Sequence, residues 1–128
     1  MKKIFTYFMF FLSATLLESC HNKVEVSNFE SVDVEQFKSV ILSNDVQCVD
    51  VRTESEYQDG HIEGSINIDV LKPDFSKTAT DILKKEQTVA IYCRSGNRSK
   101  KAGEILAEMG FHVVELNVGY KGWVEQTK

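Results

Sequence analysis

The sequence holds few of the residues that build disulfide frameworks or metal sites, since its 128 residues include three cysteines and three histidines. No pair of cysteines or histidines has the spacing of a structural zinc site, so neither a metal nor another cofactor is expected. The sequence also contains a single proline and no internal repeat. With 42% hydrophobic and 27% charged residues, its composition is that of one ordinary globular domain.

Basic residues are outnumbered, because 15 lysines and arginines stand against 19 aspartates and glutamates and the formal net charge is -4. A nucleic-acid-binding protein usually presents a basic surface, often with aromatic platforms for the bases. Nucleic acid is therefore not an expected partner. The local exception is a group of basic residues between positions 93 and 101, which lacks aromatic neighbours and is more typical of a site for a small anion.

The first twenty residues differ from the rest of the chain. Met1-Lys2-Lys3 precedes an uncharged apolar run from Ile4 to Leu17, which is short for a membrane span and typical of a signal peptide. The segment Leu17-Glu18-Ser19-Cys20 resembles the lipobox of bacterial lipoproteins. This resemblance implies a signal peptide over 1–19 and a lipid on Cys20 that holds the exported protein at a membrane of the periplasm or cell envelope. Because Glu18 departs from the lipobox pattern, a plain secretory signal is the alternative.

A polar tether is expected over 20–28, followed by a single domain over 29–128. Strands are expected at 46–51, 66–68, 88–92 and 113–116. Helical patterns cover 31–44, part of 52–60, 75–85, 99–109 and 119–128. This alternation predicts an α/β fold with a central parallel β-sheet flanked by helices on both faces, in which ligands bind at the carboxyl ends of the strands.

Cys93 carries the strongest chemical signal, because it directly follows the apolar run 88–92 and precedes a helical pattern. The residues after it are Arg94, Ser95, Gly96, Asn97, Arg98 and Ser99. A helix N-terminus and nearby cations stabilise a thiolate, and the amides of such a loop can form a nest for an anion. A cysteine buried only for packing has no use for two arginines that must be solvated or paired. The pattern therefore predicts a nucleophilic sulfur in an anion-binding loop.

Four stretches, in order, resemble the motifs of the rhodanese domain family of sulfurtransferases. They are Asp50-Val51-Arg52 with Glu56-Tyr57, residues 60–68, residues 93–99 and residues 119–123. The resemblance implies a single rhodanese-like domain with a persulfide on Cys93. It further implies transfer of sulfane sulfur from a small anionic donor, such as thiosulfate, to cyanide or a thiol. Residues 94–99 would bind the donor, while the oligomeric state is not indicated.

Several neighbouring residues are assigned structural roles. Asp50 and Arg52 are expected to form a buried pair near a strand end, and His61 is expected to hydrogen-bond a loop carbonyl. Cys48 lies inside an apolar run, so it is expected to face the core. A disulfide between Cys48 and Cys93 is not favoured, because positions within strands seldom have the required geometry.

Two other classes of function are weighed against sulfur transfer. Cysteine phosphatases and arsenate reductases use a Cys-x5-Arg loop, whereas Cys93 and Arg98 are separated by four residues. The shorter loop encloses a smaller ring of amides, better suited to a sulfur atom than to a tetrahedral phosphate. A non-enzymatic module that binds a partner or passively carries sulfur is the remaining alternative, and a turnover assay distinguishes it from an enzyme.

Overall fold

The computed structural model describes residues 28–128, so the predicted signal peptide, Cys20 and most of the predicted tether lie outside the described residues. Five strands form one sheet in the order β1-β5-β4-β2-β3, and every pairing is parallel. The strands are β1 (Phe29–Val32), β2 (Val46–Asp50), β3 (Ile66–Asn67), β4 (Thr88–Tyr92) and β5 (Val113–Leu116). The helices are α1 (Val34–Ile41), α2 (Glu54–Asp59), α3 (Phe75–Ile82), α4 (Asn97–Glu108) and α5 (Gly119–Gln126). The predicted parallel α/β sheet is confirmed.

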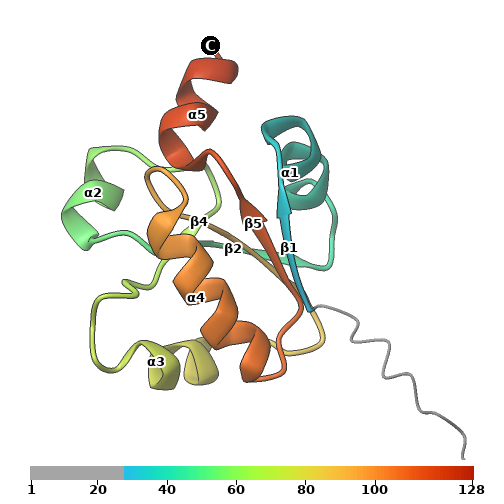
Figure 1. Ribbon diagram of the computed structural model, residues 1–128, viewed down its shortest axis with the longest axis vertical. Coiled ribbons are helices and arrows are strands. Elements are labelled where there is room, and N and C mark those ends of the chain that lie inside the picture. The colour runs from blue at the N-terminus through green and yellow to red at the C-terminus, as the bar shows by residue number, and fades with distance from the viewer. Residues whose placement is uncertain (1–27) are drawn as a thin grey trace, which may run out of the picture.

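Helices cover both faces of the sheet, as predicted. Figure 1 shows α3 and α4 on one side of the strands and α1 and α5 on the other. Strand β4 lies between the two layers, with Val89 and Ile91 in one hydrophobic cluster and Ala90 and Tyr92 in the other. Because successive side chains of a strand point to opposite faces, this central strand is apolar throughout.

The first strand was not predicted, and the helix expected over 31–44 covers only 34–41. Asp33 ends the strand and begins the helix, since its carboxylate accepts a hydrogen bond from the Gln36 amide in a capping box. Strand β1 has four residues and pairs only with β5 at the sheet edge. Its middle residues Glu30 and Ser31 are both exposed, so the sequence shows no alternating pattern to reveal it. The other expected elements are present, with ends that differ by a few residues.

The carboxyl ends of the strands meet the loops that carry the predicted site. Cys93 directly follows β4, and the segment after β5 runs beside it, because the Tyr120 amide donates to the Cys93 carbonyl at 2.7 Å. The Lys121 amide donates to the Arg94 carbonyl at 3.0 Å. The fold therefore brings the loops after β4 and β5 together at one edge of the sheet. Among residues 28–128, no helix has both the length and the apolar character needed to cross a membrane.

Candidate active site

Cys93 and the residues that follow it, 93–99, form what we call the active loop. Cys93 is 1% exposed, and its Sγ accepts a hydrogen bond from the Gly96 amide at 3.1 Å. Gly96 has φ of 104°, in the region that glycine adopts most readily. A Cβ at this position would also collide with the Asn117 carbonyl oxygen. Glycine is therefore required for the turn that directs a backbone amide at the sulfur.

The environment of Cys93 favours its thiolate. Burial alone would raise the pKa of the thiol, but hydrogen bonding with the Ser99 side chain and with the Ser99, Gly96 and Ser95 amides outweighs it. The pKa of Cys93 consequently lies below its ordinary value. The start of α4 adds its positive dipole end at the same place. Cys93 therefore has the geometry and electrostatics of a nucleophile.

Cys48 has the opposite character. It is a free thiol, partly buried against the core as predicted. Burial, with Asp50 nearby, raises the pKa of Cys48 to about 12. Cys93 is also a free thiol, so no disulfide joins the two. Of these two cysteines, only Cys93 is poised to react at neutral pH.

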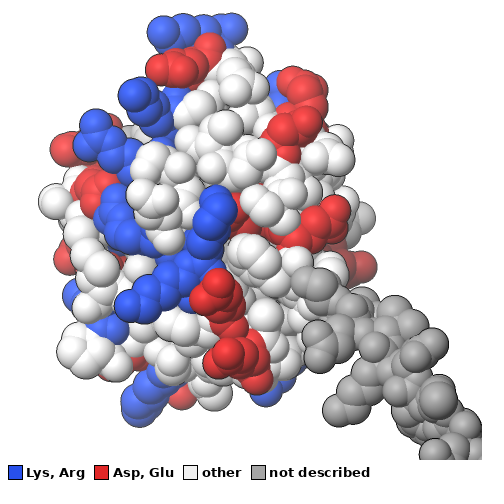
Figure 2. Space-filling view, in the orientation of Figure 1, with Lys and Arg blue, Asp and Glu red and all other residues white. Residues whose placement is uncertain are grey.

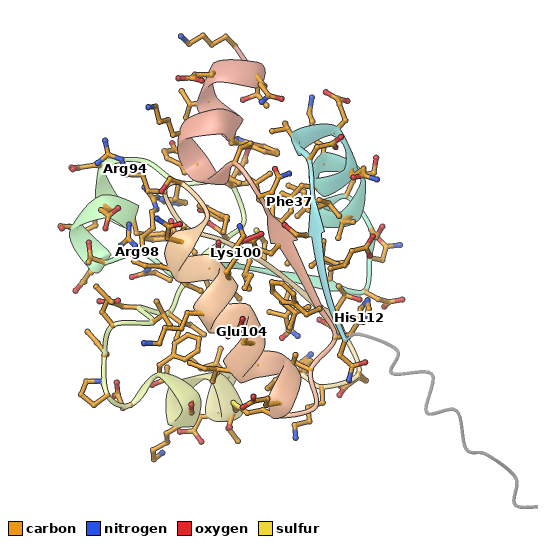
Figure 3. All side chains as sticks on the ribbon, viewed as in Figure 1. Phe37, Arg94, Arg98, Lys100, Glu104 and His112 are labelled. Carbon is orange, nitrogen blue, oxygen red and sulfur yellow. The ribbon has the colours of Figure 1, made fainter. Side chains whose placement is uncertain are left out.

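The two arginines of the active loop differ in their surroundings. Arg98 donates two hydrogen bonds to the Glu56 carboxylate of α2, at 2.7 and 2.9 Å. These hydrogen bonds lower the pKa of Glu56 to about 2. The Arg94 side chain is exposed and forms no ion pair with any residue of the described 28–128 segment. Both side chains lie on the α2 side of the molecule (Figure 3), but only the charge of Arg94 is uncompensated.

The other predicted loop residues separate into two groups. Ser99 is buried, and its Oγ lies 3.4 Å from Cys93 Sγ. Ser95 and Asn97 are exposed at the rim. The structure thus brings Gly96 and Ser99 against the sulfur and leaves the side chains of Ser95 and Asn97 open to solvent.

Residues with structural roles connect the elements around the active loop. Arg52 pairs with Asp50 at 2.6 Å, as expected for a buried pair, and also donates to the Gly60 carbonyl at 2.7 Å. Its guanidinium lies 4.4 Å from the centre of the Tyr120 ring. His61 Nδ1 hydrogen-bonds the Tyr57 carbonyl at 2.7 Å, so its partner is a main-chain carbonyl as expected, but one of helix α2 and not of a loop.

One buried residue of the site was missed by the sequence analysis. Glu115 of β5 is 0% exposed, and its carboxylate accepts a hydrogen bond from Ser99 Oγ at 2.6 Å. The sequence does contain a sign of this residue's role, because a glutamate within the short apolar strand 113–116 can be buried only if it finds polar partners.

A hollow of about 480 Å³ opens beside the active loop. Its lining includes Arg52, Glu56, Gly60, Arg94, Tyr120 and Lys121. Figure 2 shows lysine and arginine side chains gathered over the beginning of α4, next to acidic ones. Arg94, Lys121 and Lys128 place cations at this opening, alongside the carboxylates of Asp59 and Glu125.

The sequence is similar to those of known proteins. Residues 33–126 match the family model of the rhodanese-like domain. The thiosulfate sulfurtransferase PspE of Escherichia coli (strain K12) is 44% identical over 73 residues, covering 57% of this chain and 69% of that protein. Thiosulfate sulfurtransferase 18 of Arabidopsis thaliana is 30% identical over 122 residues, covering 86% of this chain and 89% of that protein.

Solved structures show the same likeness. The crystal structure of a rhodanese-related protein from Thermoplasma volcanium superposes with a TM-score of 0.66 at 29% identity, covering 76% of this chain and 92% of that chain. The chain belongs to the rhodanese-like domain family.

Proposed function

We propose that this protein is a sulfurtransferase that moves sulfane sulfur from thiosulfate, or a similar small anionic donor, to cyanide or a thiol through a persulfide on Cys93. The observation that carries the proposal is the Cys93 Sγ at the end of β4, 3.1 Å from the Gly96 amide. Two relatives named as thiosulfate sulfurtransferases support the same chemistry.

The reaction has two steps, each a displacement at sulfur. The Cys93 thiolate attacks the outer sulfur of thiosulfate, the sulfur–sulfur bond of the donor breaks, and sulfite leaves with the electron pair. The acceptor, cyanide or a thiolate, then attacks the outer sulfur of the persulfide. Thiocyanate or a new persulfide leaves, and the Cys93 thiolate is restored.

The residues of the active loop have different roles in this reaction. Inward amides, such as that of Gly96, stabilise the anionic sulfur of the thiolate and the persulfide. Arg94 presents an uncompensated charge beside the opening and attracts the donor, while Ser95 and Asn97 offer polar groups at the rim. Because the charge of Arg98 is balanced by Glu56, Arg98 contributes mainly by holding the loop against α2.

Export and anchoring at a membrane of the periplasm or cell envelope are proposed from the sequence alone. The support is the uncharged run from Ile4 to Leu17 followed by Cys20. A single lipidated end would hold the domain at a membrane face without burying it.

Intact mass measurement tests the sulfur transfer directly. Thiosulfate should add one sulfur atom, about 32 Da, to the protein, and cyanide should remove it with formation of thiocyanate. Repeated turnover distinguishes an enzyme from a passive sulfur carrier. A protein that binds no sulfur under these conditions would contradict the proposal.

A further inference from the structure

A buried carboxylate hydrogen-bonds Ser99, the residue whose hydroxyl lies beside the Cys93 sulfur. Glu115 is 0% exposed, and Ser31 of β1 and Ser99 of α4 each donate a hydrogen bond to it at 2.6 Å. Lys100 Nζ lies 3.5 Å from both carboxylate oxygens and supplies a counter-charge. The hydrogen bond from Ser31 helps to join β1 to β5. The hydrogen bond from Ser99 joins α4 to the same carboxylate, and it links Glu115 to the hydroxyl that lies beside the Cys93 sulfur.

Ser99 has one hydroxyl proton and three nearby acceptors. Its Oγ lies 2.6 Å from Glu115 Oε2, 3.2 Å from the Gly96 carbonyl and 3.4 Å from Cys93 Sγ. Hydrogen bonds to a charged acceptor are the shortest and strongest, so the proton points at the carboxylate. The free lone pairs of Ser99 Oγ then face the sulfur. In this arrangement the Cys93 thiol donates to Ser99, and Ser99 donates to Glu115.

We propose that Glu115 is a positioning residue that acts on Cys93 through Ser99 and takes up the proton that Cys93 releases when it becomes a nucleophile. This inference rests on the proposed function, because it describes how the nucleophile of that reaction is formed. The Cys93 proton passes to Ser99 Oγ while the Ser99 proton passes to Glu115. A thiol and a carboxylate become a thiolate and a carboxylic acid, and no proton is gained or lost.

The transfer also reverses the direction of the Ser99 hydroxyl. Its new proton lies on the side of the sulfur, so Ser99 now donates to the thiolate instead of accepting from the thiol. A stabilising hydrogen bond is thus formed in the same step that creates the charge. The charged side chains facing this chain of groups are Lys100, beside Glu115, and the Arg98–Glu56 pair, beside Cys93.

Two groups that share one proton give a distinctive pH dependence. While the shared proton is present, the fraction of Cys93 that is thiolate does not change with pH. The reactivity of Cys93 should therefore reach a plateau over the middle of the pH range and rise only when the pair loses its proton. Without Glu115, the thiolate fraction should instead fall about tenfold for each pH unit below the thiol pKa.

The test measures the rate at which iodoacetamide alkylates Cys93 from about pH 5 to about pH 9, followed by mass spectrometry of the peptide that contains Cys93. The full chain and its Glu115→Gln, Ser99→Ala and Glu104→Gln variants are compared. Glu115→Gln keeps the shape and hydrogen-bonding capacity of the side chain but removes the group that acts as the base. Glu104 is an exposed residue of α4 and provides a control for the same chemical change (Figure 3).

The parent and Glu104→Gln are expected to show the plateau, whereas Glu115→Gln and Ser99→Ala are expected to lose it. A rate that is scaled equally at every pH in Glu115→Gln would show a purely structural role and overturn the proposal, as would a parent without a plateau. If Glu115→Gln does not fold, the pH dependence of alkylation in Ser99→Ala decides whether the proposal holds. Alkylation requires no sulfur transfer, so a plateau in a protein that binds no sulfur would refute the proposed function and leave this relay intact.

Discussion

Two hydrogen bonds join the Arg98 guanidinium to the Glu56 carboxylate, with nitrogen–oxygen distances of 2.7 and 2.9 Å. Glu56 belongs to α2 and Arg98 to α4, so the pair connects a helix at one side of the site to the active loop. Both side chains are about three-quarters buried, at 27% and 25% exposure. The pair therefore fixes the position of an arginine whose charge is no longer free to attract substrate.

Replacing Glu56 with glutamine is expected to lower the free energy of unfolding by about 1 kcal/mol at neutral pH, because a two-pronged, partly buried pair is lost. Arg98 lowers the pKa of Glu56 from 4.5 to about 2. A carboxyl with a lowered folded-state pKa stabilises the protein above pH 4.5, and this contribution disappears as the pH falls toward 2. The free energies of unfolding of the parent and Glu56→Gln, measured in urea, should therefore differ at neutral pH and converge as the pH falls from 4.5 toward 2.

Glu63→Gln provides the control for this comparison, since Glu63 is an exposed residue in the turn before β3. Its stability should match that of the parent at each pH. The assigned role of the pair would be contradicted if the parent and Glu56→Gln had the same free energy of unfolding at neutral pH. It would also be contradicted if the difference between them stayed constant as the pH fell to about 2.

Cys93 is expected to be the only sulfur carrier among the cysteines of the domain. Cys93→Ser should abolish both the gain of about 32 Da after thiosulfate and the turnover, because the attacking thiolate is lost. Cys48→Ser should keep both, because burial holds the pKa of Cys48 at about 12 and its thiol stays protonated at neutral pH. Intact mass and thiocyanate formation measure the two effects, and sulfur loading that persists in Cys93→Ser would refute the assignment.

Gly96→Ala is expected to damage the site more than the fold. At φ of 104° a Cβ is strained, and it would also meet the Asn117 carbonyl, so the amide that faces Cys93 must move. Gly64 is a matched control, because it has φ of 83° but no atom within 4 Å of the added Cβ. Gly64→Ala should lose about 1–2 kcal/mol of stability through backbone strain, and Gly96→Ala should lose more because its Cβ also collides with the Asn117 carbonyl. Sulfur loading should fall at least about tenfold in Gly96→Ala alone, and equal loading in both variants would contradict the role of the Gly96 amide.

The sequence was sufficient to predict the parts of this protein that depend on local pattern. Strand β4 is apolar throughout because it is buried on both faces, and Cys93 follows it directly, so the strand and the nucleophile were both visible. Contacts between distant residues were not visible. Arg98 meets Glu56 across 42 positions and Ser99 meets Glu115 across 16, and only the folded chain brings these polar groups together. For that reason the charge of Arg98 could be recognised from sequence but its neutralisation could not.

Lipid attachment at Cys20 is expected to place the protein in the membrane fraction of cells. Cys20→Ala should yield a soluble exported protein or block processing, because the acceptor of the lipid is removed. Fractionation and incorporation of a radiolabelled fatty acid measure the effect. If the parent is absent from the membrane fraction or takes up no label, a signal-cleaved protein without a lipid would replace this interpretation and the Cys93 chemistry would be unaffected.

Arg94 is expected to act on donor capture through its charge. The side chain is exposed beside the hollow and forms no ion pair within residues 28–128, so its full charge faces an approaching anion. Arg94→Ala should raise the KM for thiosulfate about fivefold, the equivalent of about 1 kcal/mol for one charge contact in water. A neutral sulfur donor should show little change.

Two controls, the ionic strength and a variant that lacks a distant lysine, distinguish the loss of attraction for thiosulfate from a general loss of activity. Rising ionic strength should raise the thiosulfate KM of the parent toward that of Arg94→Ala, because an exposed charge is screened. Lys38→Ala removes the same charge from α1, on the opposite face of the sheet from α4, and should leave the KM unchanged. Equal losses with the charged and the neutral donor in Arg94→Ala would instead show that Arg94 maintains the shape of the loop, and its role in attracting the donor would have to be abandoned.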